Sequence, residues 1–147
     1  MSSRLRRLLC GLALYVAFVA PAMTDDFRPA YLQLKQLDAT TYDVLWRVPA
    51  LDANTTLRLQ PVFPQGTEEL TERTRSYAGN AAVLRWRIRV DGGMAGQVVE
   101  FPQLPGSRVD VLVRVERSDG TEQLGRVLPV DPRFTVTSSP GHLEVVK

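Results

Sequence analysis

In the stretch Val83–Val90, apolar and charged side chains alternate strictly from Leu84 onwards. Successive side chains of a β-strand point to opposite faces, whereas a helix would mix the two sets, so this pattern indicates a half-buried strand. The apolar set, expected to face a core, is Leu84, Trp86, Ile88 and Val90. The opposite face would carry a row of three arginines: Arg85, Arg87 and Arg89.

The same period of two recurs along the chain. Tyr42–Val48 and Val109–Glu116 alternate in the same way, and turn-forming residues separate them from other short β-rich runs. These further strands are predicted at Tyr31–Leu37, Thr56–Phe63, Arg73–Ala78, Gln97–Leu104, Thr121–Leu128 and Arg133–Val136. Ser118-Asp119-Gly120 predicts a hairpin with a tight two-residue turn, because Asp-Gly tolerates positive φ angles. Only Glu68–Arg75 suits a helical turn.

Eight or nine short strands with regular turn signals predict an all-β fold, an antiparallel immunoglobulin-like β-sandwich. The single cysteine rules out the Cys-Trp-Cys core of antibody domains, so the likeness concerns architecture alone. Trp46 and Trp86 share the inward side of their strands, and we expect them in the core rather than in a ligand cage.

The N-terminus has the three parts of a secretory signal peptide. Arg4, Arg6 and Arg7 precede the apolar run Leu8–Val19, and Ala20-Pro21-Ala22 supplies small residues for cleavage. We therefore expect a signal-peptide helix at residues 1–22, a β-sandwich domain at 23–137 and a linker or tail at 138–147. An uncleaved anchor is the alternative, although the apolar run is shorter than the roughly 20 residues of a stable membrane span. Cys10 precedes most of that run, so lipid attachment there is not expected.

Charge and cysteine content change once the signal is set aside. The chain has 18 basic and 16 acidic residues, and without the three N-terminal arginines the 15 remaining basic residues give a net charge of −1. Nucleic-acid binding needs a concentrated positive surface, so no nucleic-acid partner is expected. The remainder also has no cysteine, which suits an oxidising compartment. These features predict an exported protein, in the periplasm or at the outer face of the cytoplasmic membrane.

Two early segments carry a resemblance to a known family. Phe27–Leu34 and Thr41–Ala50 resemble the opening of the exported N-terminal domain of HupE/UreJ-type bacterial membrane proteins, with weaker matches in order at Asp110–Val115, Asp119-Gly120 and Pro132–Val136. In that family the domain precedes a membrane-embedded half that bears histidine motifs and is associated with nickel or cobalt uptake. The resemblance implies an extracytoplasmic accessory domain whose partner is a membrane transporter, without the membrane half itself.

The candidate metal ligands are few. Relatives of this type often begin the mature chain with a His-Glu pair, and here Asp25-Asp26 stands in that place. Nickel and cobalt favour imidazole, whereas adjacent carboxylates suit hard cations and rarely form a site unaided. The single histidine, His142, lies in a Pro-Gly linker. No resident cofactor is expected, and nickel or cobalt enters only through the family association.

The sequence contains no Gly-x-Ser-x-Gly elbow, phosphate-binding glycine loop or metalloprotease motif. Asp43 and Glu100 could form a carboxylate pair for acid–base chemistry, but both occupy polar strand positions that normally face water. The Arg85, Arg87 and Arg89 row is the strongest candidate for partner binding, with about 7 Å between neighbours. Its alternative is a solvated face with cross-strand partners such as Glu100 or Glu116. We expect a non-enzymatic accessory or interaction domain without a small-molecule substrate; the alternatives are a structural envelope protein and a metal-binding chaperone or enzyme.

Overall fold

The structure, a computed structural model, describes residues 28–50 and 58–139, and this part of the chain is all-β. No helix long and apolar enough to cross a membrane occurs within it. The described strands are β1 (Ala30–Gln36), β2 (Thr41–Pro49), β3 (Thr67–Glu69), β4 (Thr74–Ala78), β5 (Ala81–Val90), β6 (Val98–Glu100), β7 (Val111–Glu116), β8 (Glu122–Val127) and β9 (Arg133–Thr135). The predicted all-β class is confirmed. The predicted signal-peptide helix at residues 1–22 lies outside the described residues.

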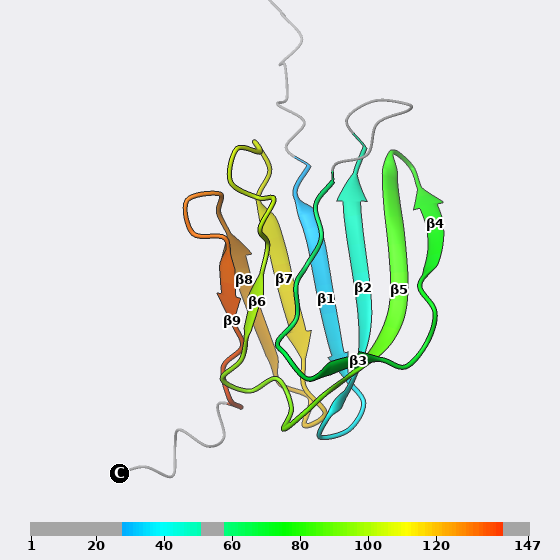
Figure 1. The fold of residues 1–147 in the computed structure, drawn as a ribbon, viewed down its shortest axis with the longest axis vertical. Helices are drawn as coiled ribbons and strands as arrows, with labels where there is room; N and C mark the ends of the chain where they lie inside the picture. The colour runs from blue at the N-terminus through cyan, green and yellow to red at the C-terminus, as the bar shows by residue number, and fades with distance from the viewer. Residues whose placement is uncertain (1–27, 51–57, 140–147) are drawn as a thin grey trace, which may run out of the picture.

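Most strands belong to one large sheet. Its order is β3-β5-β2-β1-β7-β8, and β4 pairs with β5 at the same margin as β3 (Figure 1). β6 and β9 form a small antiparallel sheet, to which Val62 adds one bridge at Glu100. In Figure 1 the small sheet lies in front of the large one, so it covers only one of that sheet's faces.

The large sheet is mixed, which corrects the prediction of a wholly antiparallel fold. β1 and β7 run parallel, with Leu32 beside Val113, while the other pairs of the sheet are antiparallel. A parallel pair needs a long connection, and the chain from β2 to β6 provides it. The alternation of apolar and polar residues does not indicate whether two strands so far apart in the chain run parallel or antiparallel.

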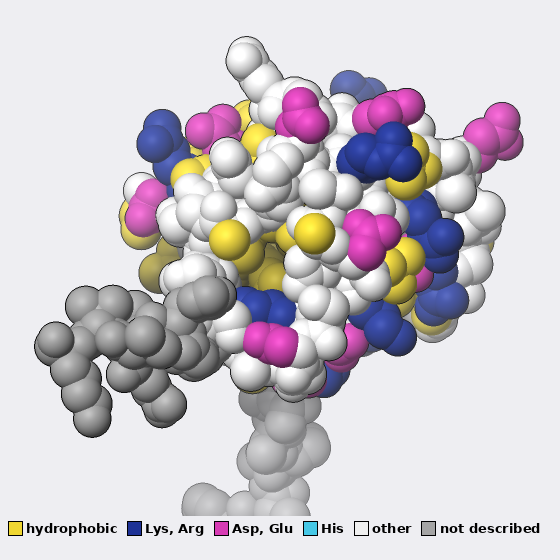
Figure 2. All heavy atoms as spheres, turned by 90° about the horizontal axis from the view of Figure 1, so that it is seen from below, with side chains coloured by type: hydrophobic (Ala, Val, Ile, Leu, Met, Phe, Trp, Pro, Cys, Tyr) yellow, Lys and Arg dark blue, Asp and Glu magenta, His cyan; other side chains and the backbone are white. Residues whose placement is uncertain are grey.

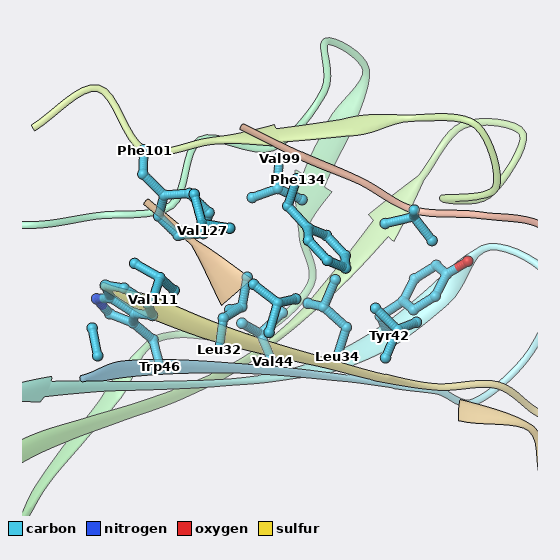
Figure 3. Packing of buried hydrophobic residues seen from close by; sticks show 14 of the residues in the cluster. Leu32, Leu34, Tyr42, Val44, Trp46, Val99, Phe101, Val111, Val127 and Phe134 are labelled. Carbon is cyan, nitrogen blue, oxygen red and sulfur yellow. The ribbon is translucent and has the colours of Figure 1, made fainter. Parts of the chain in front are cut away.

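The core lies between the two sheets. Trp46, Leu32 and Leu34 of the large sheet face Val99 and Phe134 of the small one across the layer (Figure 3). Trp46 is 2% exposed, and its Nε1 donates a hydrogen bond to the Leu59 carbonyl oxygen at 3.1 Å. Trp86 is 4% exposed, so both tryptophans are core residues as predicted. The inward positions of β2, β5 and β7 are the ones that the alternation indicated.

The predicted hairpin at Ser118-Asp119-Gly120 joins β7 to β8, but its loop has three residues rather than two. The Arg117 amide donates to the Thr121 carbonyl oxygen at 2.8 Å, and the Gly120 amide donates to the Arg117 carbonyl oxygen at 3.0 Å. Gly120 has a φ of 87°, in the left-handed region. A three-residue hairpin loop commonly consists of a turn followed by one left-handed residue, and Gly120 is that residue here.

Asp119 in this hairpin makes a pH-dependent contact. Its carboxylate accepts hydrogen bonds from the Ser139 hydroxyl and from the Thr121 hydroxyl and amide, and these lower the pKa of Asp119 from 3.8 to about 2. A lowered pKa favours folding above the unfolded value of 3.8, and this contribution disappears as the pH falls towards 2.

We therefore expect the Asp119 carboxyl carbon, followed by NMR, to titrate with a midpoint near pH 2. Ser139→Ala removes the largest cause and should move the midpoint up towards 3.8. A midpoint that Ser139→Ala leaves unchanged would contradict the assignment.

Candidate binding face

The large sheet has one face that no described segment covers, which we call the open face. Because side chains alternate along each strand, the residues between the core positions of β1, β2, β5, β7 and β8 point to it. Its basic side chains are Lys35, Arg47, Arg85, Arg87, Arg89, Arg114 and Arg126, and the acidic ones of these strands are Asp43, Glu116 and Glu122. Three further carboxylates adjoin the face, namely Glu68, Glu72 and Asp110. Basic groups therefore outnumber acidic ones only slightly, and the carboxylates pair with some of the arginines.

The three predicted arginines all lie on the open face, and the structure distinguishes them. Arg87 Nε donates to Asp43 Oδ1 at 2.7 Å, and this bond raises the pKa of Arg87 above its usual value. Arg89 Nη1 lies 3.6 Å from Glu68 Oε2. Arg85 is exposed, and its guanidinium makes no ion pair with any described residue, that is, with any residue in the ranges 28–50 and 58–139. Arg85 is thus the member of the row that is open to an external anion.

Cross-strand carboxylates do pair with two arginines of the row, as the alternative of a solvated face had it, but the residues named for it, Glu100 and Glu116, were wrong. Glu116 contacts Arg114 at 3.1 Å, and Glu100 lies 3.8 Å from Arg133, so neither carboxylate reaches the row. The strand register explains the difference, because Asp43 is paired with Arg87 across β2 and β5, and Glu68 with Arg89 across β3 and β5.

A groove crosses this part of the open face. It has a volume of about 590 Å³ and lies between β1, β2, β5 and the link from β3 to β4. Arg85, Arg87 and Lys35 supply positive charge, and Thr74 and Gln33 supply neutral polar groups. Asp43 and Glu72 also line the groove. This mixture can bind a carboxylate-bearing segment through Arg85 while Asp43 holds Arg87 in place.

Two further ion-pair groups lie on the β7–β8 side of the open face. Arg114 contacts Glu122 at 2.6 Å, and hydrogen bonds from Arg114, first to Glu122 and then to Tyr31, raise its pKa above the usual value. Arg126 Nε donates to the buried Asp110 at 2.6 Å. These arginines have intramolecular carboxylate partners, so they are weaker candidates for an external ligand than Arg85.

The lower end of the molecule has a second hollow. It has a volume of about 280 Å³ and is lined by Tyr42, Val115 and Val136 beside Arg117 and Asp119. Figure 2 views this end and shows a hollow with hydrophobic side chains inside it, while Lys and Arg side chains gather at the right of the view. Among the described residues of the lining the only carboxylate is Asp119, which is already bound by Ser139 and Thr121. The described lining therefore supplies no pair of carboxylates for acid–base chemistry.

The remaining predicted site residues are dispersed. Asp43 lies on the outer side of the large sheet and Glu100 in the small sheet, so the structure does not bring this carboxylate pair together. Asp25, Asp26 and His142 lie outside the described residues. Among the residues that the structure does describe, no group of three or more His, Cys, Asp or Glu side chains could hold a metal ion.

Sequence reasoning missed the contribution of Lys35 and Thr74 to the groove. Lys35 is an outward residue of β1, and alternation places it on the open face, but its closeness to Arg85 depends on the order of the strands. The segment Glu68–Arg75 suited a helical turn by sequence, so the place of Thr74, at the start of β4 beside the arginines, was not predicted.

Comparisons with known proteins add no assignment to this face. No family model matches the chain, and no curated protein is significantly similar to it. The resemblance to HupE/UreJ-type domains therefore stays a prediction that rests on the segments quoted above.

Proposed function

We propose that this protein is a non-enzymatic, extracytoplasmic accessory domain that docks on a membrane transporter of the HupE/UreJ kind. The open face would bind an acidic segment of that transporter, and Arg85 in the groove would receive one of its carboxylates. The observation that carries this proposal is the exposed Arg85 without an ion-pair partner in the described part of the chain, beside Lys35 and a fixed Arg87.

The chemistry of the groove supports an acidic protein partner. A guanidinium presents a planar fork that matches a carboxylate, and such charge-assisted bonds are roughly twice as strong as neutral ones. Asp43 and Glu72 at the groove would repel carboxylates at the wrong positions, which favours one register over others. Binding at an exposed face of this kind should weaken as salt concentration rises.

We also propose the immunoglobulin-like type for the sandwich and the periplasm for its location. Two facing sheets with a shared core support the first. The N-terminal arginines, the apolar run that follows and the absence of cysteine after Cys10 support the second. Cell fractionation with mass spectrometry tests the location: the chain should appear in the periplasmic fraction without residues 1–22, or membrane-bound with them if the signal is an anchor. Recovery in the cytoplasm would contradict export.

Charge reversal at Arg85 tests the docking surface. The full chain, purified after export, is immobilised and incubated with detergent-solubilised membranes of its source organism, and captured proteins are identified by mass spectrometry. We expect capture of a histidine-bearing polytopic membrane protein, and Arg85→Glu should reduce it by about tenfold, which corresponds to about 1.4 kcal/mol.

The matched control is Arg108→Glu, which makes the same charge change at an exposed arginine of the loop before β7. It should leave capture unchanged. Equal losses in the two variants would indicate a general effect of net charge and remove the groove from the proposal. Absence of any captured membrane protein would contradict the accessory function itself.

A further inference from the structure

β8 forms a free margin of the large sheet. It pairs with β7 on one side, and no described strand pairs with its other side (Figure 1). The hairpin bond between Arg117 and Thr121 sets the alternation of hydrogen-bonded pairs along β7 and β8. By that alternation the amide and carbonyl groups of Glu122, Leu124 and Arg126 point away from β7, towards the free side.

The side chains of these three residues form a self-complementary pattern. Leu124 is 72% exposed, and Glu122 and Arg126 lie two residues before and after it on the same face. If a second β8 runs antiparallel to the first with the two Leu124 residues opposite each other, each Glu122 faces an Arg126 of the other copy. This arrangement has twofold symmetry, so the ion pair between Glu122 of one copy and Arg126 of the other occurs twice.

We propose that two copies of this chain pair through β8 in this register, so that their large sheets join into one continuous sheet. Roughly six backbone hydrogen bonds would cross the junction, because three residue pairs each exchange two bonds. The inference does not depend on the proposed transporter partner. If both hold, the dimer presents two grooves on one continuous face, which would strengthen binding to a partner with two acidic segments.

The existing contacts of β8 are compatible with this junction. Arg114 binds Glu122 through Oε1 at 2.6 Å, and the second carboxylate oxygen, Oε2, can accept a bond from the other copy. Arg126 is bound to Asp110 and its side chain is still 57% exposed. The core side of β8 is already occupied, since Gln123 donates to the Thr135 carbonyl oxygen at 3.0 Å.

The composition of β8 distinguishes it from a protected edge. Natural edge strands commonly carry lysine, proline or a bulge that prevents pairing. Glu122–Val127 contains neither lysine nor proline, and its two charges have opposite signs. β4 at the other margin has Arg75 as its only charged residue, so antiparallel self-pairing there would bring together no opposite charges.

Sedimentation velocity of the full chain, purified after export, tests the pairing. We expect a monomer–dimer equilibrium that shifts to dimer as protein concentration rises. Glu122→Arg and Arg126→Glu each place like charges opposite one another at two positions, and each should raise the dimer dissociation constant by roughly tenfold or more. An equimolar mixture of the two variants should restore association. In a dimer of one variant with the other, each side chain at position 122 faces a side chain of opposite charge at position 126 of the other copy.

Restored association in the mixture separates this register from damage to the fold, since a misfolded variant would not regain binding from the other one. A wild-type chain that stays monomeric at all concentrations would overturn the proposal. So would a mixture that associates no better than its components.

Cross-linking tests the symmetry axis independently. In a Cys10→Ser background, Leu124→Cys should form a disulfide-linked dimer on mild oxidation, because paired Cα atoms in this register lie about 5.5 Å apart, within the range of a disulfide. Leu112→Cys, on the same open face but on β7, is the matched control and should stay monomeric. Equal cross-linking of both variants, or none for Leu124→Cys, would overturn the register.

Discussion

Replacing Trp46 by alanine is expected to lower the free energy of unfolding by about 4 kcal/mol, within the range for large aromatic residues deleted from a core. Trp46 is 2% exposed and lies between the two sheets. Its ring is 5.8 Å from that of Phe101, and its Nε1 bonds to the Leu59 carbonyl oxygen at 3.1 Å. Truncation would leave a cavity and a buried carbonyl group without this donor.

Urea unfolding followed by far-ultraviolet circular dichroism measures this loss, since that signal arises mainly from the backbone and not from the deleted indole. Phenylalanine substitutions at the two tryptophans provide the control. Trp46→Phe forfeits a buried hydrogen bond, whereas Trp86 Nε1 has no hydrogen-bond partner among the described residues. Trp86→Phe should therefore cost less than Trp46→Phe. A loss below about 1 kcal/mol for Trp46→Ala would show that the second layer does not pack on Trp46.

The long strands of the large sheet were predictable because each has one buried and one solvated face. β2, β5 and β7 were predicted from their alternation to within two residues at each end, and their inward side chains form the core. β3 carries no such pattern, since Thr67, Glu68 and Glu69 are all polar. It pairs along one margin of β5 through its backbone, which sequence periodicity does not record.

The prediction of a helical turn over Glu68–Arg75 was wrong for the same reason. Charged residues at short spacing suit a helix surface, but here the backbone is extended and held by β5. The Leu70 amide donates to the Arg87 carbonyl oxygen at 2.8 Å, and the Arg87 amide donates to the Thr71 hydroxyl at 2.9 Å. A tertiary contact with a distant strand thus overrides the local preference.

The candidate site was predictable as a row of arginines but not as a set of contacts. Alternation alone placed Arg85, Arg87 and Arg89 on the solvated face. Which of them is neutralised depends on the register of β2 and β3 against β5, and loop lengths and core packing fix that register. The difference between Arg85 and its neighbours therefore emerges only from the folded sheet.

Gly93 lies in the turn that follows β5, and Gly93→Ala is expected to lower the free energy of unfolding by about 3 kcal/mol. Gly93 has a φ of 80°, which L-residues adopt at a cost of about 1 to 2 kcal/mol. An added Cβ would also lie 2.7 Å from the Ala39 carbonyl oxygen, a backbone atom that cannot rotate away. The shift needed would strain the adjacent bond from the Met94 amide to the Tyr42 hydroxyl, which spans 2.9 Å.

Gly92→Ala separates these two causes within the same turn. Gly92 has a φ of 74°, but an added Cβ there meets nothing within 4 Å. Its substitution should cost only the conformational strain, about 1 to 2 kcal/mol, in urea unfolding followed by tryptophan fluorescence. Equal losses for the two variants would mean that the Ala39 carbonyl moves freely. A larger loss for Gly93→Ala would show that the close packing of the β1–β2 turn against residue 93 fixes this end of the large sheet, where Tyr42 enters the core.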